Sequence, residues 1–149
     1  MTDEIWLEIE GFEGRYEISN FGRVRSVGRF VNMMRRNGII GKKWKKERIL
    51  KTHTWGAPYP GIVLLSDDMK RHRKAIHQLV AKAFLPNPMG YLIVDHIDSN
   101  SHNARVDNLR WCTVGQNIEF AYQSGNRKIG KEHHFAKLPR NESGFCQKE

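Results

Sequence analysis

Cysteine and long apolar runs are both scarce in this chain. Only Cys112 and Cys146 occur among 149 residues, far apart and outside any CxxC pair, which excludes a disulfide framework and a cysteine zinc site. Free, buried thiols are the ordinary expectation for such cysteines. No apolar run approaches the roughly 20 residues that a membrane span needs, and residues 1–4 are acidic where a secretory leader would be basic. We therefore expect a cytoplasmic protein without a membrane partner.

Acidic residues are also scarce where basic residues gather. The chain has 25 lysines and arginines against 16 aspartates and glutamates, a net charge of +9. Residues 23–51 hold eleven bases against the single acid Glu47, and a second basic cluster spans residues 70–74. Such density is typical of a protein with a polyanionic partner, and Trp44 and Trp55 are available for stacking. Nucleic acid is the leading candidate. A merely solvated basic face is the plainer alternative, and a membrane surface is disfavoured because no amphipathic helix accompanies the charge.

The N-terminal half has the pattern of a small antiparallel sheet. Alternation of apolar and polar residues, interrupted by glycines, predicts strands at residues 6–12, 16–20, 24–27, 48–51 and 59–65. Residues 28–46 are basic and punctuated by glycine, which predicts a long loop or a hairpin. Asp67-Asp68 predicts a turn.

The second half changes to helical spacing at His77, and this helix is expected to stop before Pro86. An apolar run at 92–94 then leads into Asp95-His96, followed by a polar loop over 97–108 and a strand over 109–113. Thr113 and Gln116 have capping-box spacing and predict a helix that Gly125 closes. The order is strand, loop, strand, helix. It places Asn117 near the start of the last helix, with its side chain expected to face back toward the end of the first of these strands.

These patterns predict an α+β chain in three parts. A β-rich module spans 1–76, a compact strand-loop-strand-helix unit spans 77–126, and a basic, poorly patterned tail spans 127–149.

One short segment of the compact unit concentrates reactive side chains. Asp95, His96, Asn108 and Asn117 supply a carboxylate, an imidazole and two amides. An aspartate and an asparagine can hold one Mg²⁺ with positions left for substrate phosphate, and a histidine outside the metal shell can take a proton from water. Such a set can hydrolyse a phosphodiester. A zinc site using His102 with Asp95 and His96 is an alternative, but zinc sites normally use more His or Cys than this segment offers.

At these residues the sequence resembles the HNH endonucleases of the ββα-metal type, in particular the phage and intron homing group with an N-terminal NUMOD4 motif. The positions similar to NUMOD4 are Trp6, Ile9, Gly11, Phe12, Gly14, Tyr16, Ile18, Ser19, Asn20, Gly22, Val24 and Arg25. The positions similar to the HNH core are residues 77–84, 95–98, Asn100, Asn103, Arg105, Val106, Asn108, Leu109 and Trp111. Many matched positions in the same order make this signal far more specific than a lone motif.

The resemblance implies an enzyme and assigns roles to the reactive set. Asp95 and Asn117 would hold one Mg²⁺, with Mn²⁺ as the other candidate metal, and His96 would be the general base. Asn108 would be the middle asparagine that pins the loop. The implied products are a 5′-phosphate and a 3′-hydroxyl, made by nicking or by double-strand cleavage of DNA. The alternative is a catalytically inactive DNA-binding protein on an HNH scaffold, and a third possibility is an RNA-binding module.

Three features differ from the family pattern. Ser99 stands where glycine is usual and is expected to strain a turn that prefers positive φ. Ala104 replaces a second asparagine, so loop rigidity and hence rate are expected to suffer. Residues 130–138 resemble the entry to a C-terminal helix-turn-helix, yet the sequence stops at Glu149. We expect a missing recognition module and loose site selectivity. Asp98 is expected to have a structural role in the loop.

Basic side chains of the N-terminal module are expected to contact the phosphates of double-stranded DNA without reading bases. They are Arg23, Arg25, Arg35, Arg36, Lys42, Lys43, Lys45, Lys46, Arg71 and Arg73. A monomer or a homodimer acting in the cytoplasm of a bacterial host cell is expected.

Overall fold

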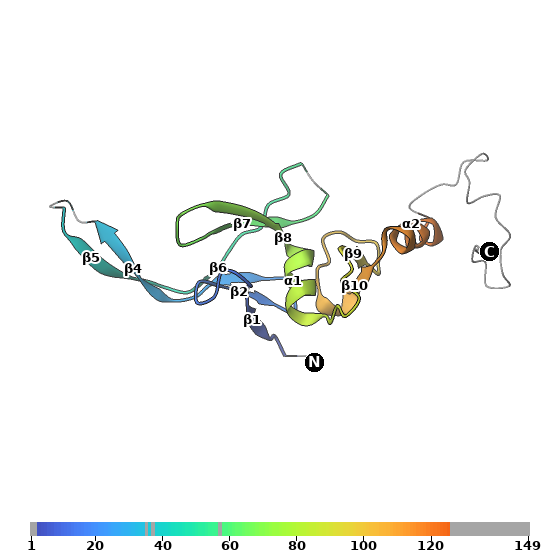
Figure 1. Ribbon diagram of the computed structural model, residues 1–149, viewed down its shortest axis with the longest axis horizontal. Helices are drawn as coiled ribbons and strands as arrows, with labels where there is room; N and C mark the ends of the chain where they lie inside the picture. The colour runs from blue at the N-terminus through green and yellow to red at the C-terminus, as the bar shows by residue number, and fades with distance from the viewer. Residues whose placement is uncertain (1–2, 35, 37, 57, 126–149) are drawn as a thin grey trace. The chain divides into compact units, whose positions relative to one another are not determined.

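The computed structural model in Figure 1 describes residues 3–34, 36, 38–56 and 58–125. The chain divides into two compact units, Met1–Cys112 and Thr113–Glu149. The first unit combines antiparallel strands with helix α1, and the second begins with helix α2, which confirms the predicted α+β class. Within the described ranges, no helix is long and apolar enough to cross a membrane.

The first sheet has four antiparallel strands in the order β1-β2-β3-β6. They are β1 (Trp6–Glu8), β2 (Tyr16–Ser19), β3 (Val24–Ser26) and β6 (Arg48–Ile49). The corresponding predicted strands are confirmed but shorter. β1 ends early because the chain turns at Gly11, whose φ of +77° suits glycine, while the Phe12 amide donates to the Ile9 carbonyl at 2.8 Å.

Strands β4 (Arg29–Met34) and β5 (Ile40–Lys45) form a hairpin of their own. Of the two possibilities for residues 28–46, the hairpin is therefore confirmed. Figure 1 shows this two-stranded ribbon extending away from the four-stranded sheet. The register pairs Phe30 with Trp44, and their rings meet edge to face at 5.0 Å between centroids.

Strand β7 (Gly61–Leu65) pairs with β8 (Arg71–Ala75) around the predicted turn. The residue pattern did not predict β8, because four consecutive basic or imidazole side chains show no apolar alternation. The backbone ladder to the apolar β7 holds it in place instead. Helix α1 (Ile76–Phe84) follows directly and buries Ile76, Leu79 and Val80.

The next elements occur in the predicted order. Strand β9 (Ile93–His96) pairs antiparallel with β10 (Leu109–Cys112), and the short helix η1 (Val106–Asn108) lies just before β10. Helix α2 (Val114–Gln123) begins in the second unit. Its predicted capping box is confirmed, since Thr113 Oγ1 accepts from the Gln116 amide at 3.2 Å and Gln116 Oε1 accepts from the Thr113 amide at 2.9 Å. Gly125 follows the helix with φ of +73°.

One hydrophobic cluster joins the four-stranded sheet and the β7–β8 pair to α1 and the β9–β10 hairpin. Its members include Ile18, Val24, Leu64, Val80, Val94 and Leu109. The β2–β3 turn also contacts the loop before β10: the Val106 amide donates to the Asn20 carbonyl at 2.9 Å. A Cβ on Gly22 would come within 3.0 Å of the Ala104 carbonyl oxygen. The module boundaries expected at residues 76 and 126 stay predictions. The tail at 127–149 lies outside the described residues.

Candidate active site and nucleic-acid interface

The β9–β10 hairpin presents Asp95 and His96 at the end of β9. Its register sets Arg110 opposite Asp95 and Leu109 opposite His96. Because neighbouring residues of a strand point to opposite faces, the carboxylate and the imidazole occupy different environments. Asp95 is half-buried, whereas His96 is 6% exposed.

Asp95 is held by its cross-strand neighbour. Nε of Arg110 donates to Oδ2 of Asp95 at 2.8 Å, and Nη2 forms an ion pair with the same oxygen at 2.7 Å. A guanidinium that binds in this way fixes the orientation of the carboxylate. The second carboxylate oxygen, Oδ1, is outside this pair. The residue pattern did not single out Arg110, because only the strand register reveals its position opposite Asp95.

His96 lies among other aromatic rings. The Tyr59 ring stacks on it at 5.8 Å between centroids with an interplanar angle of 13°, and the His77 ring meets it edge to face at 5.1 Å. Burial lowers the pKa of His96, against the opposing effect of the nearby carboxylates of Asp95 and Asp98. A lowered pKa keeps the imidazole neutral near pH 7, as a general base requires.

The loop after β9 is organised by Asn108 and Asp98. Asn108 is 9% exposed; its Nδ2 donates to Asp98 Oδ1 and to the Asn103 carbonyl, both at 2.8 Å, and its Oδ1 accepts from the Asp98 amide at 3.0 Å. Asp98 also accepts from the Asn103 side chain and the Asn100 amide. These hydrogen bonds, that of Asn103 foremost, hold the pKa of Asp98 below its usual range. Asp98 thus has the structural role expected of it.

Ser99 has φ of +59°, so the expectation of a left-handed turn at this position is confirmed. A serine there carries the strain that glycine would avoid. The other departure, Ala104, is buried at 6% exposure and packs against Gly22, so its methyl group belongs to the core of the first unit.

Asn117 lies in the first turn of α2, where its amide donates to the Thr113 carbonyl at 3.0 Å. Asp95 belongs to the first compact unit and Asn117 to the second. That the two act together therefore stays a prediction.

The donor set suits a hard cation better than zinc. Among the described residues, no group of three or more His, Cys, Asp or Glu side chains gathers as a metal cluster, and this argues against the alternative with His102. A single carboxylate with one oxygen outside its ion pair fits Mg²⁺, which commonly keeps water and substrate phosphate as its other ligands.

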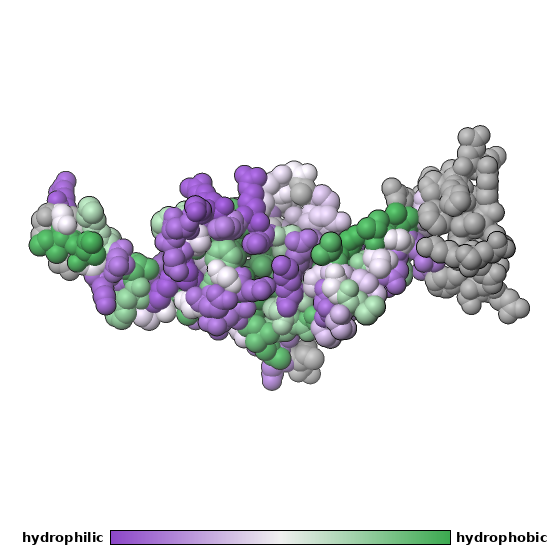
Figure 2. Space-filling model, in the orientation of Figure 1, coloured by the Kyte–Doolittle hydropathy of each residue, from purple (hydrophilic) through white to green (hydrophobic). Residues whose placement is uncertain are grey.

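The β4–β5 ribbon carries most of the predicted phosphate contacts. Lys42 and Lys43 are exposed on opposite faces of β5, Lys45 is partly exposed at its end, and Lys46 follows. Large apolar side chains are exposed on the same ribbon, and the green surface at its end is visible in Figure 2. They are Phe30, Met33, Met34, Ile39, Ile40 and Trp44. Arg36 lies in the turn between the strands, and Arg35 lies outside the described residues.

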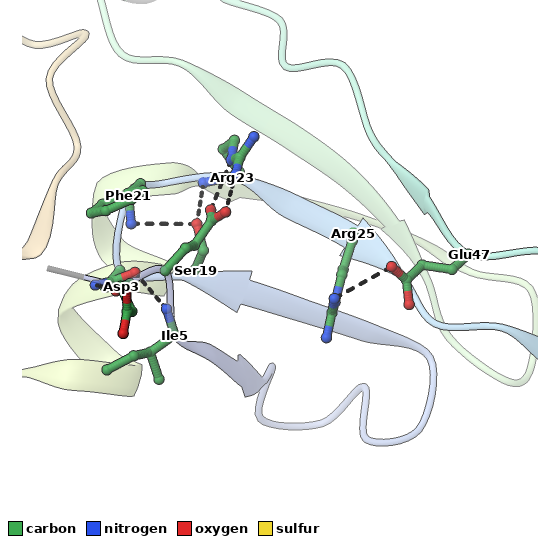
Figure 3. Close-up of polar contacts among 9 residues, drawn as sticks. Asp3, Ile5, Ser19, Phe21, Arg23, Arg25 and Glu47 are labelled. Atoms are coloured by element: carbon green, nitrogen blue, oxygen red, sulfur yellow. Dashed lines mark hydrogen bonds and ion pairs between the residues drawn. The ribbon is translucent and has the colours of Figure 1, made fainter. Parts of the chain in front are cut away.

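Arg23 and Arg25 are engaged within the protein. Arg23 forms an ion pair with Glu4, and Arg25 forms ion pairs with Glu17 and, at 3.3 Å, with Glu47. Figure 3 shows the Arg25–Glu47 pair and the position of Arg23 beside Ser19. The Arg25 guanidinium also lies 4.4 Å from the centroid of the Trp6 ring. Phosphate contact by these two arginines remains a prediction, and it would compete with these carboxylates.

Arg71 and Arg73 are exposed on one face of β8. The Arg73 guanidinium lies 5.4 Å from the Trp55 ring, which is 44% exposed. A 520 Å³ groove beside Trp55 is lined by Arg48, Lys51 and His53, among others. A cationic groove with an exposed indole is chemically suited to a nucleic-acid backbone and its bases.

Comparison with known proteins gives matches over both halves of the chain. Residues 4–59 match the NUMOD4 motif, and residues 74–118 match the HNH endonuclease family. The chain is 31% identical to DNA endonuclease I-HmuI of Bacillus phage SP01 over 133 residues, which cover 89% of this chain and 66% of I-HmuI. It is 33% identical over 122 residues to an uncharacterized HNH endonuclease, L247, of Acanthamoeba polyphaga mimivirus, covering 79% of this chain and 26% of that protein.

A solved structure describing DNA binding and cleavage by the HNH homing endonuclease I-HmuI is similar with a TM-score of 0.65 and 31% identity. The match covers 90% of this chain and 67% of that one. The chain thus spans two thirds or less of the curated relatives' own length.

Proposed function

Because the chain belongs to the HNH endonuclease family and carries an N-terminal NUMOD4 motif, we propose that it is a metal-dependent DNA endonuclease of the homing or phage type. It would hydrolyse phosphodiester bonds to 5′-phosphate and 3′-hydroxyl ends. The observation that carries this proposal is the end of β9, where a carboxylate fixed by Arg110 is followed at once by a buried imidazole of lowered pKa.

His96 is the proposed general base. Neutral near pH 7, its imidazole takes a proton from the attacking water, a step typically worth about 10²- to 10⁴-fold in rate. Asn108 supports this step indirectly, by holding the loop that follows His96 through its bonds to Asp98 and Asn103.

Asp95 and Asn117 are the proposed ligands of one Mg²⁺ or Mn²⁺, through a carboxylate oxygen and an amide oxygen. When bound, the cation stabilises negative charge that develops on the phosphate and on the leaving oxygen. Arg110 keeps the Asp95 carboxylate in one orientation, with Oδ1 as the oxygen outside the ion pair.

The basic ribbon and strand β8 are the proposed DNA surface. Lysines on both faces of β5 and arginines on β8 suit the phosphates of double-stranded DNA. The similarity to I-HmuI supports this partner. We further propose action in the cytoplasm of a bacterial host, since one relative is a Bacillus phage protein, and a monomer or a homodimer as the acting species.

Incubation of the protein with supercoiled plasmid and Mg²⁺ tests the function. We expect nicked or linear product that is lost with EDTA and with the His96→Ala variant. Lys82→Ala, an exposed change on α1, is the matched control and should cleave normally. Intact plasmid together with a gel shift would support the alternative, an inactive DNA-binding scaffold, and preference for structured RNA in competition binding would support an RNA-binding module.

A further inference from the structure

The groove beside Trp55 is built from separate segments of the first unit and lies outside the proposed active site. Its volume is 520 Å³. Residues 48–51, at and after the edge strand β6, line it together with Ile62 and Val63 of β7. His53 and Trp55 complete the lining. None of the described residues that line the groove is acidic, so its charge suits an anion.

The backbone around Trp55 is constrained. Its φ of +36° is a left-handed conformation that is rare for a bulky side chain. Two hydrogen bonds between the backbones of His53 and Gly61, at 2.8 and 2.7 Å, hold the segment that leads to it. A Cβ on Gly61 would lie 2.8 Å from Cζ3 of the indole, so glycine leaves room for the ring here. Such strain persists only where the surroundings enforce it, and it is common at binding sites.

The indole of Trp55 remains 44% exposed, and cationic side chains surround it. The β7–β8 register sets Val63, which lines the groove, opposite Arg73, so the two residues share one face. The Arg73 guanidinium lies 5.4 Å from the centroid of the Trp55 ring. Arg48 and Lys51 supply positive charge from the segment around β6. An exposed aromatic ring in a cationic groove is the arrangement by which proteins bind unpaired nucleotides, with a base stacked on the ring.

The size of the groove distinguishes between paired and unpaired DNA. Its 520 Å³ falls within the range of about 300–1,000 Å³ that is usual for small-molecule sites, so it accommodates groups of nucleotide size and not the width of a duplex. In a duplex, moreover, proteins reach the edges of bases and not their faces. An indole can stack only on a base that has left the duplex.

The groove is also close to the proposed active site. Trp55 precedes Tyr59 by four residues, and the Tyr59 ring stacks on that of His96. The Cα atoms of Trp55 and Tyr59 are therefore at most about 14 Å apart. Ser101 Oγ donates to the Pro58 carbonyl at 2.7 Å, which ties this segment to the loop after β9. A strand that is unpaired beside the cleaved bond is thus within reach of the groove.

We propose that this groove binds an unpaired segment of the DNA substrate next to the site of cleavage. A base of this segment stacks on Trp55, and its phosphates contact Arg48 and Lys51. The proposed function assigns no role to the groove, since it uses the β4–β5 ribbon and β8 for duplex DNA. The inference rests on the proposed function in one respect, that the unpaired segment comes from the DNA that is cleaved.

Fluorescence anisotropy of a labelled oligothymidylate, a single strand without secondary structure, tests the groove. The full chain is used with EDTA, so the readout does not depend on cleavage. We expect the Kd for the oligothymidylate to rise about 5- to 150-fold in Trp55→Ala, the factor typical for the loss of one stacked base. The Kd for a duplex of the same length should change less than about twofold. Trp55→Phe, which keeps an aromatic ring, should recover most of the loss.

The matched control is Trp44→Ala. Trp44 is 50% exposed on the β4–β5 ribbon and does not line the groove. Its substitution should leave the ratio of the two Kd values unchanged. Equal losses on single strand and duplex in Trp55→Ala overturn the inference, because the groove would then serve the duplex. Tighter binding of an oligouridylate than of the oligothymidylate, lost in Trp55→Ala, overturns it in favour of RNA.

The indole N–H signals of the wild-type chain give a second readout that does not depend on the affinity of a variant. In nitrogen-15 NMR with added oligothymidylate, the signal of Trp55 should shift strongly. The signal of Trp111, whose indole donates to the Leu85 carbonyl at 3.3 Å, should stay in place. Each signal is assigned from its loss in the corresponding Trp→Phe variant. An unshifted Trp55 signal at saturation overturns the inference.

The two proposals fail in different ways. If wild type binds oligothymidylate through Trp55 but leaves supercoiled plasmid intact with Mg²⁺, the proposed function fails and the groove keeps its ligand. If plasmid is cleaved while Trp55→Ala keeps the wild-type Kd for oligothymidylate, only the inference about the groove fails.

Discussion

Asn108 uses its whole side chain to hold the loop that follows β9. It makes three hydrogen bonds, to the backbone and carboxylate of Asp98 and to the carbonyl of Asn103. Asn87 holds the loop before β9 in a similar way. Its Nδ2 donates to the Tyr91 carbonyl and its Oδ1 accepts from the Tyr91 amide, both at 2.8 Å. The two asparagines allow a loop beside the proposed base to be compared with a loop away from it.

Asn108→Ala is expected to lower the free energy of unfolding by about 1 to 3 kcal/mol, because buried partners lose their hydrogen bonds. It should also reduce plasmid cleavage about 10- to 100-fold, since the segment after His96 loses its support. Asn87→Ala should lower stability with little effect on cleavage. Urea denaturation and cleavage rates of both variants check this; a loss of cleavage of the same size in Asn87→Ala would mean that stability alone explains the effect.

His77 also predicts how stability depends on pH. Its folded pKa of about 4 lies below the unfolded value near 6.5, so the unfolded chain binds more protons between these values. Stability from the neutral, buried ring is thus present above pH 6.5 and is lost as the pH falls toward 4. The groups that face it, Tyr59 and His96, supply no carboxylate to offset its charge.

Urea denaturation at pH 7 and pH 4.5 measures this effect against His77→Phe, which has no group to titrate there. Between the two pH values, wild type should lose about 2 kcal/mol more stability than the variant. Parallel losses in the two proteins would show that His77 is not held neutral in the folded state.

At the scale of elements, the sequence predicted best where local chemistry decides the structure. The capping box at Thr113 follows from the spacing of Thr113 and Gln116, and the β9–β10 hairpin follows from the strand-loop-strand pattern. The left-handed turn at Ser99 follows from the family pattern, in which glycine is usual there. All three are present. The sequence did not predict strand β8, because its residues show no strand pattern of their own. Backbone pairing with β7 holds this segment as a strand. The contact of His96 with His77 and Tyr59 was likewise hidden, since tertiary packing brings distant residues together.

The ion-pair partners of charged residues were also hidden in the sequence. Arg23 and Arg25 belong to a basic run in the sequence, yet they pair with Glu4 and Glu17 of the acidic N-terminal segment. Partner choice across a sheet depends on register, which residue counts do not reveal.

The β4–β5 ribbon gives the sharpest prediction about DNA binding. If about six phosphates are contacted in all, log affinity should fall against log salt with a slope near −5. Replacing the exposed Lys42, Lys43 and Lys46 together by glutamine should reduce the steepness by about 2.7, because each phosphate contact contributes about 0.9. Fluorescence anisotropy on duplex DNA at several salt concentrations measures this slope for the wild type and the variant.

The control for the ribbon replaces Lys70, Lys82 and Arg105, three basic residues outside the ribbon and outside the groove beside Trp55, by glutamine. These changes remove the same charge and should alter the slope by less than one unit. Equal changes in the two triple variants would mean that total charge, and not the ribbon, determines binding.

At the scale of the whole molecule, the proposed ligands come from both compact units, Asp95 from the first and Asn117 from the second. Cleavage would then require that both units act together, whereas DNA binding by the basic ribbon would not. Removing the amide should therefore separate catalysis from binding. Asn117→Ala is expected to abolish cleavage, by about 10²-fold or more, with the Kd for DNA unchanged within about twofold.

Asn117→Asp, which keeps an oxygen ligand, should retain cleavage and bind Mn²⁺ at least as tightly as wild type, as followed by isothermal titration. Gln123→Ala, an exposed change near the end of the same helix, controls for general damage to α2 and should cleave normally. Since the amide oxygen of Asn117 supplies no charge, its removal affects only the metal ligand set and the local helix start. Full turnover by Asn117→Ala would mean that the second unit holds no ligand, and that Asp95 works with a different partner.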